Sequence, residues 1–250
     1  MNTNVLRGAV CALAVGALCA PASALAAGAN HGLNLRVRHG TSENWSGYAL
    51  TGPGPYESVS ASWTQPAVNC VKTRNGYAAF WIGIDGDTSE TVEQTGTEGD
   101  CVAGKATYGA WYEMYPRGSV PIAEPVVPGD QFTASVTYVS KALFGLISQF
   151  SLVLSDSTQG WSRTVTAWIR TPKLASAEAI AEAPSSLLLG ELPLSDFGTV
   201  GFTGFSANGS TITALTPGLE PLTMVTSHGV VKAEPSALHL GGFSDTWLHS

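Results

Sequence analysis

The chain has 250 residues, of which 19 are acidic and 12 basic, and its formal net charge at neutral pH is −7. This negative balance disfavours nucleic acids and anionic membranes as partners, because both would repel it. Charged residues make up only 12% of the chain, about half of the usual 25%, and a surface with few carboxylates suits acidic surroundings.

The N-terminus has the layout of a secretory signal peptide. Arg7 precedes an apolar run at residues 8–19. Small residues at Ala24 and Ala26 then occupy the positions that a signal peptidase reads. The apolar run is shorter than the roughly 20 residues that span a bilayer. We therefore expect residues 1–26 to be removed and the remainder to be secreted, without a membrane anchor.

Residues 27–43 are polar and contain Gly, His and Arg, which is typical of a flexible lead-in or a short pro-segment. By length, this segment is too short to cover a cleft. Residues 44–250 show no repeat and no internal linker, and they suffice for one domain with a sizeable core. We expect this domain to be a monomer.

Two cysteines, Cys70 and Cys101, remain once the signal peptide is gone. A single pair in an exported protein is typical of a disulfide, which would stabilise the fold by roughly 3–4 kcal/mol. The alternative is two free, buried thiols. A catalytic thiol is disfavoured, because the bridge would consume it.

From Asn44 onward, short runs rich in β-branched and aromatic residues are separated by Gly, Pro, Asn and Asp. Within Gln131–Val139 apolar and polar side chains alternate, as in a strand with one buried face. Many such strands favour an all-β sandwich of antiparallel sheets. The runs are Ser58–Thr64, Ala78–Ile84, Thr107–Tyr115, Gln131–Val139, Gln149–Leu154, Arg163–Ile169, Gly198–Phe205 and Leu222–Val225.

One segment does not follow this pattern. Leu174–Ala183 is rich in alanine and ends before Pro184, so local propensity predicts a short helix there.

Several common catalytic arrangements are absent from the sequence. It has no zinc-binding His/Cys spacing, no Gly-x-Ser-x-Gly elbow, no phosphate-binding Gly-Lys-Ser/Thr and no dinucleotide fingerprint. The histidines lie near the chain ends, and we expect them to be surface residues rather than bases. They are His31, His39, His228, His239 and His249.

Two strands combine aromatic rings with a carboxylate on a single face. Period-two alternation groups Trp81 with Asp85 in one strand. In the other strand it groups Trp111, Glu113 and Tyr115. A buried carboxylate needs hydrogen bonds or a wet cleft, so these faces indicate a catalytic cleft, an aromatic binding platform, or a core face with one satisfied acid.

The segment Asp85–Gly96 runs between these strands and contains aspartates and a glycine. Such residues form turns or bind calcium, but the spacing does not match the twelve-residue EF-hand loop. We expect a plain connection and no metal site.

Six blocks, in this order, resemble the glutamic peptidase (eqolisin) family. They are Asn44–Tyr48, Trp81–Asp87, Glu93–Gly96, Ala110–Pro116, Ala177–Glu182 and Asp196–Val200. The resemblance implies a two-sheet, lectin-like jelly-roll sandwich with a concave substrate cleft. It also implies that Leu174–Ala183 holds an extended strand, against its propensity.

The resemblance places a catalytic Gln/Glu dyad at Gln94 and Glu182, with Glu178 as the rival for the carboxylate. It implies an acid endopeptidase that acts on unfolded protein, needs no cofactor and resists pepstatin. For Glu182 to act as a base in acid, hydrogen bonds to its ionised form should lower its pKa. The residues implied to line the cleft or support the dyad are Trp45, Trp81, Asp85, Trp111, Glu113 and Tyr115.

Three positions depart from the family pattern. Ala179 and Met114 replace aromatic residues, and alternation turns both away from the expected cleft. Gly109 stands where an Asp is common in the family, and the loss of that Asp would alter the cleft itself. A non-catalytic sandwich that binds peptide or glycan is therefore an alternative, and a glycoside hydrolase using Glu113 and Glu182 is a weaker third.

Overall fold

The structure is a computed structural model that describes residues 29–31, 40–87, 89–186 and 188–250. The expected signal peptide and most of the segment 27–43 lie outside these ranges. Nearly all regular structure is β, with one 3₁₀ turn at Leu143–Gly145. Across the described ranges no helix is long and apolar enough to cross a membrane.

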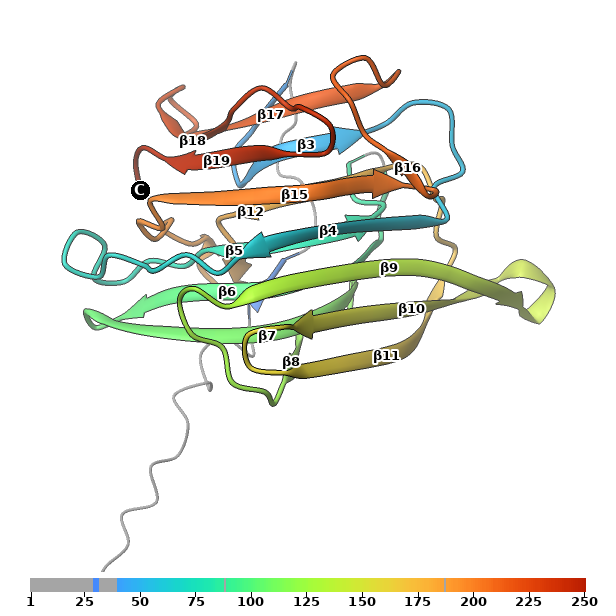
Figure 1. Cartoon of the computed structure of the whole chain (residues 1–250), viewed down its shortest axis with the longest axis horizontal. Coiled ribbons are helices and arrows are strands. Elements are labelled where there is room, and N and C mark those ends of the chain that lie inside the picture. The colour runs from blue at the N-terminus through green and yellow to red at the C-terminus, as the bar shows by residue number, and fades with distance from the viewer. Residues whose placement is uncertain (1–28, 32–39, 88, 187) are drawn as a thin grey trace, which may run out of the picture.

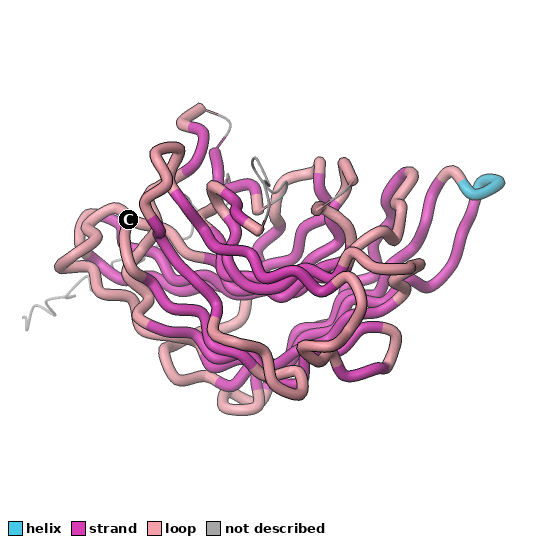
Figure 2. Tube along the Cα trace, turned by 90° about the horizontal axis from the view of Figure 1, so that it is seen from above, coloured by secondary structure: helices cyan, strands magenta, loops and turns pink. Residues whose placement is uncertain are grey.

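The strands form two stacked layers (Figures 1 and 2). One layer has the order β11-β10-β9-β4-β15-β19-β18-β17, and hydrogen bonding continues from β17 through β3-β12-β5-β6-β7-β8. Every pair along this path is antiparallel. The sequence-based prediction of an antiparallel β-sandwich is therefore confirmed.

The first layer consists of β4 (Ser58–Thr64), β9 (Gln131–Ala142), β10 (Ile147–Asp156), β11 (Trp161–Arg170), β15 (Thr199–Ala207), β17 (Leu219–Val225), β18 (Val231–Pro235) and β19 (Phe243–Trp247). The second consists of β3 (Trp45–Leu50), β5 (Ala79–Ile84), β6 (Val92–Val102), β7 (Lys105–Tyr115), β8 (Val120–Ile122) and β12 (Ala177–Glu182). The short strands β2 (Thr41–Ser42) and β16 (Ser210–Thr211) pair with β17 and β15. A separate three-stranded sheet joins β1 (Ala29–Asn30), β13 (Ser185–Ser186) and β14 (Gly190–Glu191).

The main core lies between the two layers and follows the predicted alternation. In β9, Phe132, Ala134 and Val136 are buried, whereas Gln131 and Thr133 are exposed. These side chains belong to one large cluster of buried apolar residues. All eight runs chosen from the sequence are strands.

The second layer is covered on both faces, since every residue of β3, β5 and β12 is buried. Its outer face carries a second apolar cluster around three tryptophans. We call this the site face. Its apolar members are Trp45, Ala49, Ala79, Trp81, Val92, Trp111, Ile180 and Leu222, with Tyr115 packed against them.

Strand β12 decides between the two expectations for Leu174–Ala183. It pairs along its full length with β3 and with β5. Ladder hydrogen bonds and burial on both sides outweigh the alanine helix propensity, which is worth under about 1 kcal/mol per residue. The helix expectation is wrong and the family-based one is confirmed. Ala179 and Met114 lie in the core between the layers, as alternation predicts.

Two further predictions concern loops. The Cys70–Cys101 disulfide forms, with the Cα atoms 5.3 Å apart, and ties the loop after β4 to β6. The connection after Asp85 is shorter than expected, because β6 begins at Val92 and already contains Gln94. Within the part of the chain that the structure describes, no three His, Cys, Asp or Glu side chains gather to hold a metal ion.

Candidate active site

The register of four strands sets out the site face in three rows. One row runs Glu178–Gly83–Gln94–Glu113 across β12, β5, β6 and β7. The next runs Ile180–Trp81–Gly96–Trp111, and the third Glu182–Ala79–Glu98–Gly109. Directly opposed residues share a face of a sheet, so the two predicted dyad residues and both carboxylate-bearing strands meet there.

Glu182 ends β12 and is fully buried. Its Oε2 accepts a hydrogen bond of 2.7 Å from Trp81 Nε1. Its Oε1 accepts one of 3.3 Å from Asn44 Nδ2. The ring of Trp45 packs edge-on against Trp81, with the ring centroids 4.9 Å apart. The Glu182 carboxylate is therefore fixed from β5, through Trp81, and from the residue just before β3, Asn44.

Gln94 lies in the middle of β6 and is also fully buried. Its Nε2 donates to Glu113 Oε2 at 3.2 Å, which orients the amide. The same Nε2 donates at 2.5 Å to the main-chain carbonyl of His31. Gln94 thus presents its N–H groups to a peptide carbonyl.

The described N-terminal segment therefore occupies the site. The main-chain N–H of His31 donates to Glu113 Oε2 at 2.9 Å. Its imidazole stacks on Trp111, with ring centroids 4.0 Å apart and an interplanar angle of 13°. Nδ1 lies 3.9 Å from Glu182 Oε2, and Nε2 lies 3.9 Å from Glu98 Oε2.

One expectation about this segment is wrong. His31 is not a surface residue, because its side chain is fully buried against Trp111. Residues 29–31 of the segment reach the site, where the His31 carbonyl meets Gln94. His228, His239 and His249 are exposed, as expected, and His39 lies outside the described residues.

Burial dominates the electrostatics of the site. It raises the pKa of Glu182 well above its ordinary value, and the negative charge of Glu113 adds to this effect. Burial also raises the pKa of Glu113 to about 8, against the hydrogen bond from His31. The expectation that hydrogen bonds lower the pKa of Glu182 is wrong with His31 in place, because desolvation outweighs them.

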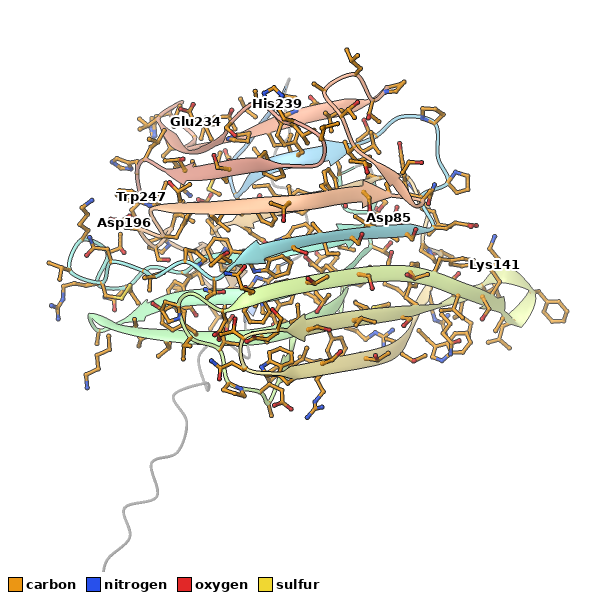
Figure 3. The ribbon with its side chains drawn as sticks, in the orientation of Figure 1. Asp85, Lys141, Asp196, Glu234, His239 and Trp247 are labelled. Atoms are coloured by element: carbon orange, nitrogen blue, oxygen red, sulfur yellow. A yellow bond between two sulfur atoms is a disulfide. The ribbon has the colours of Figure 1, made fainter. Side chains whose placement is uncertain are left out.

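The other predicted site residues take two kinds of position. Trp45, Trp81 and Trp111 lie on the site face, and Tyr115 borders it. Asp85, labelled in Figure 3, directly follows β5 and bonds to a loop instead. Its carboxylate accepts hydrogen bonds of 2.7–3.0 Å from the N–H groups of residues 173–175, which lead into β12.

Glu178, the rival carboxylate, lies in the row of Gln94 with Gly83 between them. It is fully buried, and neither carboxylate oxygen finds a hydrogen-bond partner among the described residues. Burial raises its pKa well above the ordinary value. Among the described residues His31 forms its ion pairs with Glu182 and Glu98 and none with Glu178, which favours Glu182 as the partner of Gln94.

Gly109 faces Glu98 across the β6–β7 ladder. A Cβ at position 109 would lie 2.7 Å from Glu98 Oε1, so the glycine makes room for the longer acid. Burial raises the pKa of Glu98 to about 7. The site face therefore keeps a carboxylate in this row despite the missing Asp.

Three residues escaped the sequence analysis as members of the site. Asn44 begins the first of the six family-like blocks, but its contact with Glu182 spans 138 positions. Glu98 lies two residues after Gly96, so strand alternation alone would have placed its side chain on the same face as that of Gln94. His31 lies in a segment whose composition indicates neither a helix nor a strand.

Comparison with known proteins relates the chain to peptidases. Aspergillopepsin-2 of Aspergillus niger is 32% identical over 154 residues, which are 54% of this chain and 52% of that protein. Scytalidopepsin B of Scytalidium lignicola is 38% identical over 99 residues, which are 39% of this chain and 36% of that protein. The match thus spans about half the length of the first relative and about a third of the second.

Solved structures of two peptidases are similar to this chain over most of its fold. Scytalido-glutamic peptidase with a peptide-based transition-state analogue superposes with a TM-score of 0.68 at 23% identity, covering 82% of this chain and 98% of that one. Aspergilloglutamic peptidase from Aspergillus niger superposes with a TM-score of 0.60 at 27% identity, covering 69% and 99%. The Peptidase A4 family model matches residues 43–237. Because this match takes in most of the chain, including Gln94 and Glu182, the chain belongs to the Peptidase A4 family.

Proposed function

We propose that this protein is an acid endopeptidase in which Gln94 and Glu182 hydrolyse peptide bonds. The observation that supports it best is the peptide carbonyl of His31, which accepts a hydrogen bond of 2.5 Å from Gln94 Nε2. Glu182 Oε2 lies 3.9 Å from the imidazole Nδ1 of the same residue. A substrate carbonyl in this position would accept from the Gln94 amide, with the Glu182 carboxylate beside the same substrate residue.

The chemistry follows from these groups. Ionised Glu182 takes a proton from water as the water oxygen attacks the carbonyl carbon. The Gln94 amide donates to the oxyanion that develops, a role worth roughly 3–4 kcal/mol for one donor in other enzymes. Protonated Glu182 then returns the proton to the leaving nitrogen. Both groups belong to the chain, so the reaction requires no cofactor.

The protonation state of Glu182 depends on what fills the site. With His31 in place, burial raises the pKa of the Glu182 carboxyl well above its ordinary value, which favours the protonated form. Once a hydrated substrate replaces the segment, desolvation falls, and the hydrogen bonds from Trp81 and Asn44 favour the ionised form. Activity in acid then requires that this balance bring the pKa of Glu182 down toward its ordinary value of about 4.3.

We further propose that residues 27–43 are a short pro-segment that blocks the site. Support comes from Ala29–Asn30, which pair with β13, and from His31, which covers Trp111. The protein would act outside the cell as a monomer after residues 1–26 are removed. Its substrates would be unfolded proteins and peptides. The peptide-based analogue bound by scytalido-glutamic peptidase is consistent with this class.

Digestion of a denatured protein across acidic to neutral pH, with pepstatin present, tests the proposal. We expect wild type to hydrolyse the substrate only in acid, and Gln94→Ala and Glu182→Gln to lose at least a hundred-fold in rate. Glu178→Gln is the matched control, because it makes the same change four residues away in β12, and it should keep most activity.

Hydrolysis that survives in Glu182→Gln but not in Glu178→Gln would transfer the catalytic role to Glu178. Binding of peptide by folded wild type without hydrolysis would identify a binding module instead.

A further inference from the structure

A small hairpin lies beside the dyad and holds the segment that fills the site. Strand β1 pairs with β13, with Ala29 opposite Ser186 and Asn30 opposite Ser185. These are the two residues directly before His31, whose carbonyl meets Gln94. The hairpin thus aligns a peptide just upstream of the carbonyl that the dyad would attack.

The hairpin has little structure of its own. Strands β13 and β14 have two residues each. Leu188 and Leu189, near the turn, are 95% and 77% exposed. An isolated two-stranded hairpin is marginal in water, so its position depends on contacts with the rest of the molecule.

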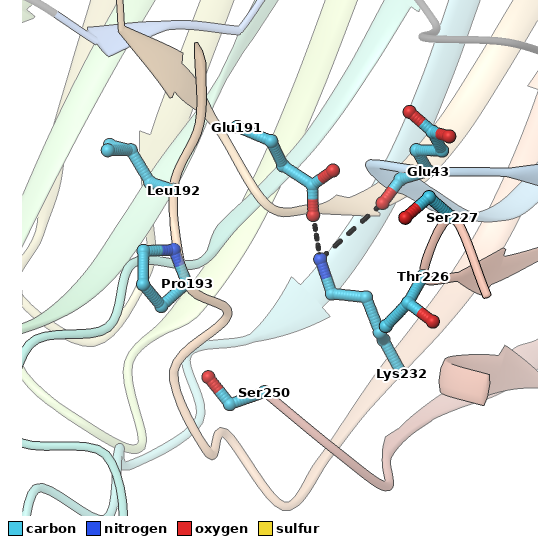
Figure 4. Close-up of a pocket in the computed structure, with 8 residues that line it drawn as sticks. All are labelled: Glu43, Glu191, Leu192, Pro193, Thr226, Ser227, Lys232 and Ser250. Carbon is cyan, nitrogen blue, oxygen red and sulfur yellow. Dashed lines mark hydrogen bonds and ion pairs between the residues drawn. The ribbon is translucent and has the colours of Figure 1, made fainter. Parts of the chain in front are cut away.

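One such contact is the ion pair between Glu191 of β14 and Lys232 of β18, drawn in Figure 4. The Lys232 side chain is only 3% exposed. Its own carbonyl accepts hydrogen bonds from the N–H groups of Leu248 and His249, at 2.8 Å and 3.0 Å. The backbone of Lys232 is therefore held by the body of the sandwich, and the residue lines a pocket of about 520 Å³.

Lys232 also reaches toward the dyad. Its Nζ donates at 3.4 Å to the carbonyl of Glu43. The next residue, Asn44, holds the Glu182 carboxylate through its side-chain amide. One ammonium group thus joins the peptide-aligning hairpin to the strand entry that positions Glu182.

We propose that Lys232 is a positioning residue whose ion pair with Glu191 fixes the β13–β14 hairpin as the strand on which a peptide substrate aligns. This inference rests on the proposed peptidase function. It predicts that the pair acts on binding of the two residues upstream of the attacked carbonyl, and not on the chemical step.

The test compares two peptide substrates with the same scissile bond. One carries three residues before that bond, and the other carries a single acetylated residue. Glu191→Gln, which leaves the contact between Lys232 and the Glu43 carbonyl in place, should raise KM for the longer peptide about ten-fold, since binding energy lost equally from ground and transition states appears in KM. The kcat, and both constants for the short peptide, should stay within about two-fold.

Matched variants separate positioning from general damage. Lys232→Met should raise the same KM by a similar factor, the double variant should be no worse than either one, and Lys232→Arg should keep most of the affinity. Lys72→Met is the control, because Lys72 forms a comparable pair with Asp196 at 3.0 Å but is 61% exposed. An unchanged KM for the longer peptide, or an equal rise for both peptides, would overturn the proposal.

Amide hydrogen exchange gives a readout that needs no activity. The Leu192 N–H donates to the Pro184 carbonyl at the base of the hairpin, at 2.9 Å. In Lys232→Met this amide should exchange at least about ten-fold faster, whereas the Ala183 amide, bonded to Asn44 in the sandwich, should not change. Unaltered exchange at Leu192 would show that the Lys232–Glu191 ion pair does not hold the hairpin. An inactive wild type refutes the proposed function separately.

Discussion

His31 couples the N-terminal segment to several groups of the site at once. Its carbonyl meets Gln94, its N–H meets Glu113, and its ring lies on Trp111. Both ring nitrogens lack hydrogen-bond partners among the described residues. Burial lowers the pKa of the imidazole to about 3. The docked state therefore binds the neutral ring.

Docking of the N-terminal segment should therefore depend on pH. The free imidazole has a pKa of about 6.5, so its contribution to docking is complete above that value and weakens as pH falls toward 3. At pH 4.5, two units below the free value, the contribution of the imidazole to docking should be roughly a hundred-fold smaller. The facing carboxyl groups oppose this trend, because their raised pKa values favour docking in acid, where they are protonated, and weaken docking as pH rises. They are Glu98, Glu113 and Glu182.

We predict that His31→Phe keeps the segment docked in acid. Phenylalanine retains a planar ring for Trp111 but cannot take up a proton, so the acid-side weakening disappears. After acidification of the full chain to pH 4.5, the variant should show a lower initial rate of peptide hydrolysis than wild type, by about ten-fold or more. His239→Phe, at an exposed position, should match wild type. Equal initial rates for His31→Phe and wild type would contradict an inhibitory segment.

The residue scale also shows what the sequence could predict of the site. Gln94 and Glu182 were assigned through blocks of local sequence, and strand alternation placed Trp81, Trp111 and Glu113 on shared faces. His31 was not found, because it meets Glu113 across 82 positions and its own segment has no periodicity. The raised pKa of Glu182 was missed as well, since burial depends on the assembled layers.

At the scale of elements, β12 shows how a neighbouring strand overrides propensity. Its alanines present small side chains to the core, and β3 approaches it closely at Gly47. Gly47 has φ of +137°, and a Cβ there would lie 2.3 Å from the carbonyl oxygen of Ala179. Local sequence predicted a helix, whereas the close approach of β3 is possible only in the assembled sheet.

We predict that Gly47→Ala destabilises the protein by about 3 kcal/mol or more, because the substitution combines a strained φ with a backbone collision. Gly201→Ala is the matched control in β15, where no atom lies within 4 Å of the added Cβ. This control should change stability by less than about 0.5 kcal/mol. Urea unfolding monitored by tryptophan fluorescence would measure both. Similar urea midpoints for the two variants would show that β3 and β12 can move apart without a loss of stability.

The whole molecule buries several carboxyl groups with little compensation. Glu93, Glu178 and Asp245 are fully buried, and their oxygens find no hydrogen-bond partners in the described ranges. Burial is the main cause that raises the pKa of each one. The low proportion of charged residues indicated an acid-adapted surface, but not that acids would lie inside, because composition does not locate a side chain.

The sign of this effect favours stability in acid. A carboxyl group with a raised folded-state pKa binds its proton more tightly when folded, so its contribution is complete below the unfolded value of about 4 and is lost as pH rises through the folded value. For Asp245 burial raises the folded pKa to about 8, and the negative charge of Glu234 adds only a smaller rise. The loss between pH 4 and pH 8 from this group is on the order of several kcal/mol.

We therefore predict that Tm falls between pH 4 and pH 8, and that Asp245→Asn reduces this fall because the amide has no proton to lose. The variant should gain stability relative to wild type at pH 8 and change little at pH 4. Thermal unfolding followed by circular dichroism at both values measures the difference. Glu57→Gln, at an exposed position, removes a carboxylate without altering burial and should keep the wild-type fall. If Asp245→Asn loses as much stability as wild type between the two pH values, the acid preference must come from other groups, with Glu93 and Glu178 the next to replace.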